Sequence, residues 1–137
     1  MADRPRYNFS VRSLLEAAGR RRRRIARESS PEQHTDHVVE LQLVVAALNR
    51  LPEDTYWRED WERKLVDFFN EERNLQQLEE HRNQEKGAAV RRLIAGWQLT
   101  GEEQEWIQGI QDRWDNIEGE LRGFNRFKVS LYEILYP

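Results

Sequence analysis

Residues 35–41 read T-D-H-V-V-E-L, and the interpretation of the whole chain depends on this stretch. Its apolar residues fit two periods, because positions 39, 41 and 43 alternate as in a strand, whereas positions 38, 41, 45 and 48 recur as on one face of a helix. A polar Asp36-His37 pair precedes the apolar residues, and Pro52 follows them. We therefore expect a short extended segment near residues 35–38 and then a helix to about Leu51, where Pro52 stops it.

Further along the chain, the apolar spacing is mostly helical. Residues 54–70 and 83–99 each show an apolar face, and T-G-E-E at residues 100–103 is a capping box that opens another helix. That helix has apolar residues at spacings of three and four, which are Ile107, Ile110, Trp114, Ile117 and Leu121. A last helix is expected over residues 124–135, and residues 74–80 fit either a strand or a helix. The expected fold is α+β and mainly helical, with at most a two-stranded hairpin.

The composition limits the kinds of chemistry that are available. The 137 residues fit one domain and include no cysteine, so disulfides, thiolate metal sites and cysteine nucleophiles are excluded. A bound metal would be held by Asp, Glu, His or Asn, which suit Mg²⁺, Mn²⁺ or Ca²⁺, or Zn²⁺ where His contributes. No apolar run approaches the length of a membrane span, so we expect no membrane association through a transmembrane helix.

The net charge of −3 conceals a strong asymmetry. Residues 1–28 carry nine Arg against three acidic residues, and the rest of the chain is correspondingly acidic. We therefore divide the chain into a basic N-terminal helical arm, residues 1–30, and a domain over residues 31–137. The densest part of the arm could contact phosphates, direct nuclear import or pair with the acidic body, and it consists of Arg20, Arg21, Arg22, Arg23 and Arg24.

Three short motifs occur in order. Asp36-His37 is followed by an apolar stretch, residues 74–78 read N-L-Q-Q-L, and residues 81–87 read H-R-N-Q-E-K-G. Together they resemble the HNH, or ββα-metal, nucleases, with the family's spacing of nine residues between Asn74 and Asn83. The resemblance covers roughly residues 34–95. It departs from the family in the 36 residues between His37 and Asn74, which replace a short loop with two predicted helices.

The resemblance implies a small ββα-metal-like core wrapped by helices, and it implies roles for particular residues. His37 would be the general base that activates water, and Asn74 would orient it through the facing backbone. Asp36 and Asn83 would bind a divalent metal, with Mg²⁺ expected first and Mn²⁺, Ni²⁺ or Zn²⁺ as alternatives. His81 competes with Asn83 for the last ligand position, and His34 and Glu40 are lesser candidates. A nucleic-acid backbone would be held by Arg82, Lys86, Arg91 and Arg92.

The expected function is therefore metal-dependent hydrolysis of phosphodiester bonds, with DNA favoured over RNA by the resemblance. Each motif alone also has a simpler interpretation, since Asp36 and Asn83 could be helix caps, His81 a solvated residue and the tryptophans core residues. The main alternative is a non-catalytic module that binds nucleic acid or protein on a degenerate HNH-like helical scaffold. A third hypothesis is a helical protein that forms a homo-oligomer through its C-terminal helices. We expect an intracellular location, cytoplasmic or nuclear.

Overall fold

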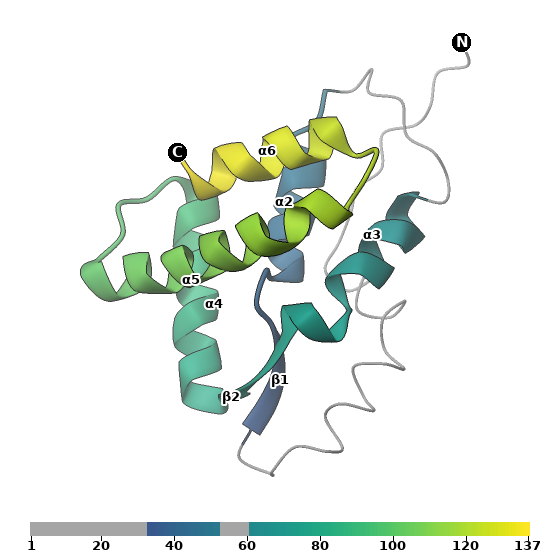
Figure 1. The fold of residues 1–137 in the computed structure, drawn as a ribbon. Helices are drawn as coiled ribbons and strands as arrows, with labels where there is room; N and C mark the ends of the chain where they lie inside the picture. Colours follow the sequence, from purple (N-terminus) through teal and green to yellow (C-terminus); the bar gives the residue numbers. More distant parts are fainter. Residues whose placement is uncertain (1–32, 53–60) are drawn as a thin grey trace.

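The computed structural model describes residues 33–52 and 61–137. The basic arm, with its predicted helix and its Arg20–Arg24 run, lies outside the described residues, as do Trp57 and the side chain of Trp61. The described part is mainly helical with one small antiparallel sheet, which confirms the expected α+β class. Figure 1 shows the hairpin at one end of the molecule and a long helix leading from it to the other helices.

The sheet consists of β1 (Gln33–His37) and β2 (Leu75–Glu79), paired antiparallel. The register places Asp36 opposite Gln76 and His37 opposite Leu75. The extended segment predicted around Asp36 is thus a strand, and residues 74–80, which the sequence left open, supply its partner. α2 (Leu41–Asn49) begins soon after β1 and ends before Pro52, as predicted.

α4 (Glu80–Ala95) follows β2 without a loop and completes a ββα unit. It begins three residues before the predicted start at Asn83 and ends at Gly96, whose φ of 77° is a left-handed helix cap. Trp97 therefore lies beyond the helix and is 63% exposed, although the helix with its apolar face was predicted to continue to residue 99. Its ring instead lies under the Arg92 guanidinium at 5.7 Å.

The remaining helices begin and end near the positions that the sequence predicts. α3 (Trp61–Phe69) leads through the short 3₁₀ turn η1 (Glu72–Asn74) into β2. α5 (Gly101–Ile117) opens at the reciprocal Thr100–Glu103 capping box and continues into η2 (Glu118–Glu120). Gly123, with φ of 86°, then allows the turn into α6 (Asn125–Leu135).

The hydrophobic core forms where α2, α4, α5 and α6 pack together. Phe69 and Trp114 stack with ring centroids 5.7 Å apart, and Phe127 meets both rings edge-on. All five residues of the predicted α5 stripe are buried in this core. Because that stripe packs inside its own chain, it is not available as the face through which two copies were expected to pair.

Candidate functional site

The side chain of Asn74 stabilises the turn that follows β1 through hydrogen bonds. Its carboxamide oxygen accepts a hydrogen bond from the Val39 amide at 2.9 Å, and its nitrogen donates to the carbonyls of Val39 (3.1 Å) and Phe69 (2.8 Å). Its own carbonyl accepts from the Val38 amide at 2.7 Å. The Asn74 side chain is fully buried, so it fixes the two residues after His37 and the end of α3 at once.

The imidazole of His37 is held by a second asparagine. Its Nε2 lies 3.1 Å from Oδ1 of Asn70, and both residues are buried. In the tautomer that carries its hydrogen on Nε2, this nitrogen donates to the carboxamide oxygen of Asn70, and the lone pair of neutral His37 is on Nδ1. Asn70 lies directly after α3, so the predicted helical insertion supplies the residue that orients the predicted base.

Asp36 points to the opposite face of β1 from His37, because successive strand residues alternate. Its Oδ2 accepts a hydrogen bond from Gln76, its cross-strand partner, at 2.9 Å. The same oxygen lies 2.6 Å from Nζ of Lys86 on α4. This carboxylate and the Lys86 ammonium are both buried and form an internal ion pair.

Three oxygen atoms converge on the Lys86 ammonium. Besides Asp36, the carbonyl oxygen of His37 lies 2.6 Å from Nζ, and Oε1 of Glu40 lies 3.6 Å away. Burial raises the pKa of the Glu40 carboxyl above its usual value, although the neighbouring Lys86 and a hydrogen bond from Gln42 both lower it. The ammonium therefore stabilises a corner that contains two buried carboxyl groups.

The oxygens around Lys86 are of the type that a hard divalent cation prefers, since they come from carboxylates and a backbone carbonyl. Among residues 33–52 and 61–137, no three His, Cys, Asp or Glu side chains gather as a ready metal site. The donor set fits a cation, and the Lys86 ammonium stands in its place. A metal ion would be held by Asp36, with Glu40 and the His37 carbonyl beside it.

Asn83 and His81 both lie in the first turns of α4, so they differ by about 200° around the helix axis. Asn83 is half-buried and lies three residues before Lys86, on the same side of α4. His81 is exposed and pairs with Glu85 at 2.8 Å. Of the two rivals for the last ligand position, Asn83 has the better placement. The side chain of His34 lies outside the described part.

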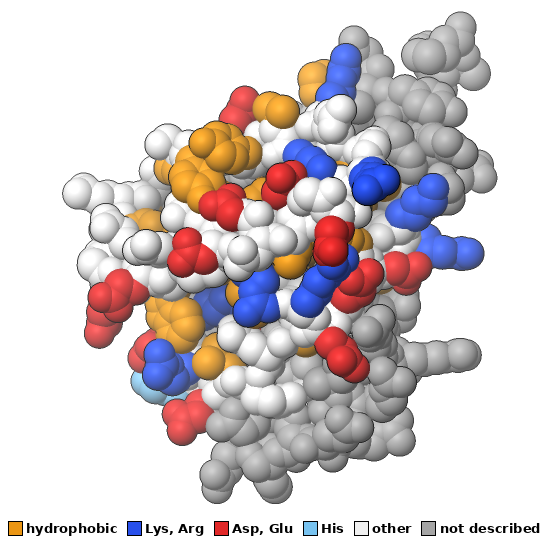
Figure 2. All heavy atoms as spheres, viewed as in Figure 1, with side chains coloured by type: hydrophobic (Ala, Val, Ile, Leu, Met, Phe, Trp, Pro, Cys, Tyr) orange, Lys and Arg blue, Asp and Glu red, His pale blue; other side chains and the backbone are white. Residues whose placement is uncertain are grey.

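The basic residues predicted to hold nucleic acid do not form one surface. Lys86 is buried against Asp36, and Arg92 pairs with Glu103 at 3.1 Å. The Arg82 guanidinium lies 5.1 Å from the centroid of the Trp106 ring, and Arg91 is exposed on the far side of α4, nine residues from Arg82. The described residues contain 12 Lys and Arg against 17 Asp and Glu. On the face shown in Figure 2 the two signs are interspersed.

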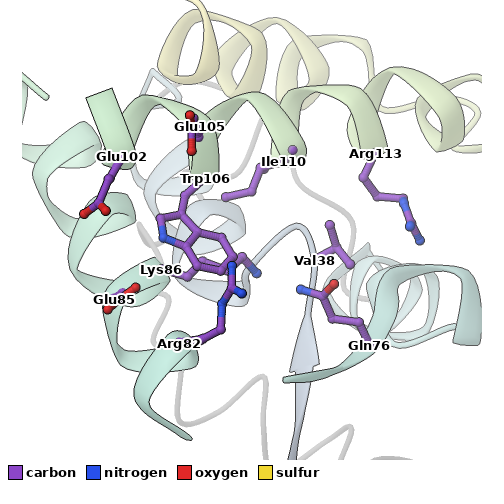
Figure 3. Close-up of a pocket in the computed structure, with 11 residues that line it drawn as sticks. Val38, Gln76, Arg82, Glu85, Lys86, Glu102, Glu105, Trp106, Ile110 and Arg113 are labelled. Carbon is purple, nitrogen blue, oxygen red and sulfur yellow. The ribbon is translucent and has the colours of Figure 1, made fainter. Parts of the chain in front are cut away.

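A cavity of about 400 Å³ lies between the hairpin, α4 and α5 and reaches the Lys86 side chain. Its lining combines Val38 and Gln76 from the hairpin with Arg82 and Lys86 from α4 and Trp106 from α5. Figure 3 shows Arg82, Lys86 and Trp106 close together, with Gln76 and Val38 across the cavity. Lys86 and Gln76, which both contact the Asp36 carboxylate, therefore also line a cavity that combines apolar and charged groups.

No family model, curated protein or solved structure matches the chain. No helix in the described part is long and apolar enough to span a membrane.

The sequence motifs contain Asp36, His37, Asn74 and Asn83 but do not indicate two side chains that contact them, Asn70 and Gln76. Asn70 was interpreted as the end of a helix, and Gln76 was only part of the N-L-Q-Q-L motif. Neither carries a recognisable signal alone, because each role arises from the strand register or from the insertion that ends at Asn70. Lys86 had a signal in its motif position but was assigned to phosphate binding; here its ammonium faces Asp36.

Proposed function

We propose that the chain is an HNH-like nuclease that hydrolyses phosphodiester bonds, with DNA as the favoured substrate and Mg²⁺ as the favoured metal. The observation that supports this is the assembly of three sequence motifs into one ββα unit. Asp36 and His37 end β1, Asn74 fastens the following turn, and Asn83 lies at the head of α4. The first motif lies more than 30 residues before the second, and the strand pairing brings these two together, with α4 following directly.

His37 would act as the general base. A neutral imidazole at this position would take a proton from a water molecule that attacks phosphorus, and the contact with Asn70 would fix the orientation of the ring. Asn74 positions this base indirectly, because it fixes the backbone on the C-terminal side of His37. We call Asn70 and Asn74 positioning residues, since both act through His37.

The charge of the phosphodiester must be relieved as water attacks. A divalent ion bound by Asp36 and Asn83 would supply that positive charge beside the phosphoryl oxygens. Gln76 holds the Asp36 carboxylate towards α4, so the oxygen donors face the helix that carries Asn83. Arg82, which lines the cavity beside this corner, is placed to contact a neighbouring phosphate.

A cleavage assay tests the proposal. Purified full-length protein is incubated with supercoiled plasmid, single-stranded DNA or RNA, each with Mg²⁺, Mn²⁺, Ni²⁺ or Zn²⁺. We expect metal-dependent cutting that His37→Ala lowers by about 10²- to 10⁴-fold. His81→Ala is the matched control, because this exposed histidine should not matter. Intact substrates with every metal, from a folded protein, would refute the proposal.

A second candidate is a non-catalytic module that binds nucleic acid or protein on the same scaffold. Three observations favour it. His37 is only 5% exposed, and Asp36 already has a buried cationic partner in Lys86. The two side chains also leave β1 on opposite faces, with partners on different elements. Nucleic acid would then be bound through the basic arm, because the described surface is acidic. This candidate predicts salt-sensitive DNA binding without cleavage, which is lost when residues 1–28 are removed. Binding that survives the truncation would exclude the arm as the binding element.

A further inference from the structure

The Lys86 side chain occupies an unusual position for a lysine on a helix surface. It is 2% exposed, and its ammonium is surrounded by oxygens of Asp36, His37 and Glu40. An ammonium is a compact charge on a flexible four-carbon stem, so it can adopt other positions when a competing charge arrives. Lys86 also lines the cavity between the hairpin, α4 and α5.

We propose that Lys86 is a resident counter-cation that competes with divalent metal for the oxygens of Asp36 and its neighbours. The two cations cannot share the site, because like charges at such distances repel strongly in a buried environment. Metal therefore binds when the ammonium withdraws, and the lysine holds the donors in place while metal is absent. This inference rests on the proposed metal use of Asp36, but it concerns metal affinity and not cleavage.

The structure also supplies a route for the incoming ion. The cavity reaches Lys86 and is lined by Gln76, which itself donates to Asp36. An ion that enters there would reach Gln76 and Lys86, the two side chains that contact the Asp36 carboxylate. Two carboxylates that lose their ammonium become a strongly attractive site for a divalent cation, since nothing else in the described corner neutralises them.

Lysine substitutions test the competition directly. Lys86→Ala removes the ammonium and opens space, so we expect it to bind Mn²⁺ about tenfold or more tightly than the wild type, as measured by calorimetry and by metal-dependent Tm. Lys86→Ala combined with Asp36→Asn keeps the space but loses the anionic donor, and this matched control should lose the gain. Equal Mn²⁺ affinity of wild type and Lys86→Ala, or a gain that Asp36→Asn leaves intact, would overturn the proposal.

Folding of the variant is itself informative. Lys86→Ala leaves buried carboxylates unpaired, so the metal-free variant is expected to be less stable than the wild type. If it does not fold alone, refolding on addition of millimolar Mn²⁺ supports the proposal, because the metal then replaces the ammonium. Failure to fold with Mn²⁺, while the double variant folds, would contradict it. These readouts involve no substrate, so they stand apart from success or failure of the cleavage assay.

Discussion

Two regions of this molecule are buried by different means. The helical core, where α2, α4, α5 and α6 meet, is apolar and centres on the rings of Phe69, Trp114 and Phe127. The hairpin corner, defined as Asp36, His37, Glu40, Asn74 and Lys86, is equally shielded from solvent but is almost entirely polar. It is held by directed hydrogen bonds and an ion pair.

The helical core and the hairpin corner contribute differently to the stability of the fold. Apolar burial is favourable wherever it occurs and contributes about 25 cal/mol per Å². A buried ion pair contributes little net stability, because desolvation offsets its attraction, and replacing the pair by apolar residues is often neutral or stabilising. A chain selected for stability alone would have no need for Asp36 and Lys86. Their presence in the corner is consistent with the site proposed above.

The largest expected effect is on the helical core. Trp114→Ala removes a 2%-exposed ring that contacts two other aromatic rings, so it should lower the free energy of unfolding by about 3–5 kcal/mol. Urea unfolding of the variant beside Trp97→Ala, an exposed tryptophan, provides the measurement and its control. A loss below about 1 kcal/mol would mean that Trp114 is not a core anchor.

A smaller loss of stability with a specific loss of function is expected in the hairpin corner. Asn74→Ala leaves the Val39 amide and two carbonyls without their partner, which should cost about 2–3 kcal/mol. Cleavage, measured at a temperature where the variant is folded, should fall because His37 loses its fixed backbone.

Two further variants distinguish a positioning role of Asn74 from a purely structural one. Asn74→Asp keeps the acceptor for the Val39 amide but cannot donate to the two carbonyls, so it should resemble the alanine variant. Asn116→Ala, on the exposed side of α5, should change neither property. Full cleavage by folded Asn74→Ala would show that this residue has a structural role alone.

The smallest effect should appear in the pH dependence of stability. Burial raises the pKa of Glu40 in the folded state, where it faces Lys86, Asp36 and Gln42. Because the folded state then binds the proton more tightly, Glu40 contributes stability below its unfolded pKa, and this contribution is lost as pH rises through the folded pKa. Glu40→Gln removes that dependence. Unfolding free energies measured across the acidic range should therefore fall more steeply with pH in the wild type, and parallel curves would contradict this.

The helical core could be predicted from the sequence because its apolar residues recur with a single, helical period. The α5 stripe, the Thr100–Glu103 capping box and the α6 helix were all expected and all confirmed. The start of α4 was misplaced because Asn83 was taken as a cap, whereas the chain turns from β2 into the helix at Glu80. Trp97 was misplaced because its periodicity continues past the Gly96 cap, which ends the helix.

The corner was predicted less completely, because its contacts depend on three-dimensional register. The ordered motifs indicated Asp36, His37, Asn74 and Asn83, but no local pattern indicated that Asn70 would meet His37 across 33 residues. Similarly, a lysine in an N-x-x-K-G motif is equally compatible with a solvated phosphate ligand and a buried partner of Asp36. Because 50 residues separate Lys86 from Asp36, only the folded structure shows that this lysine pairs with Asp36.

Metal-dependent cleavage of plasmid DNA by wild type and His37→Ala, compared side by side, tests the central claim most directly. We predict cutting by the wild type that requires a divalent metal and that His37→Ala lowers by about 10²- to 10⁴-fold, while the variant stays folded by circular dichroism. The opposite result is a folded wild type that leaves DNA intact with every metal, or a His37→Ala variant that cuts as well as the wild type. Either outcome would contradict the assignment of the hairpin corner as a nuclease site.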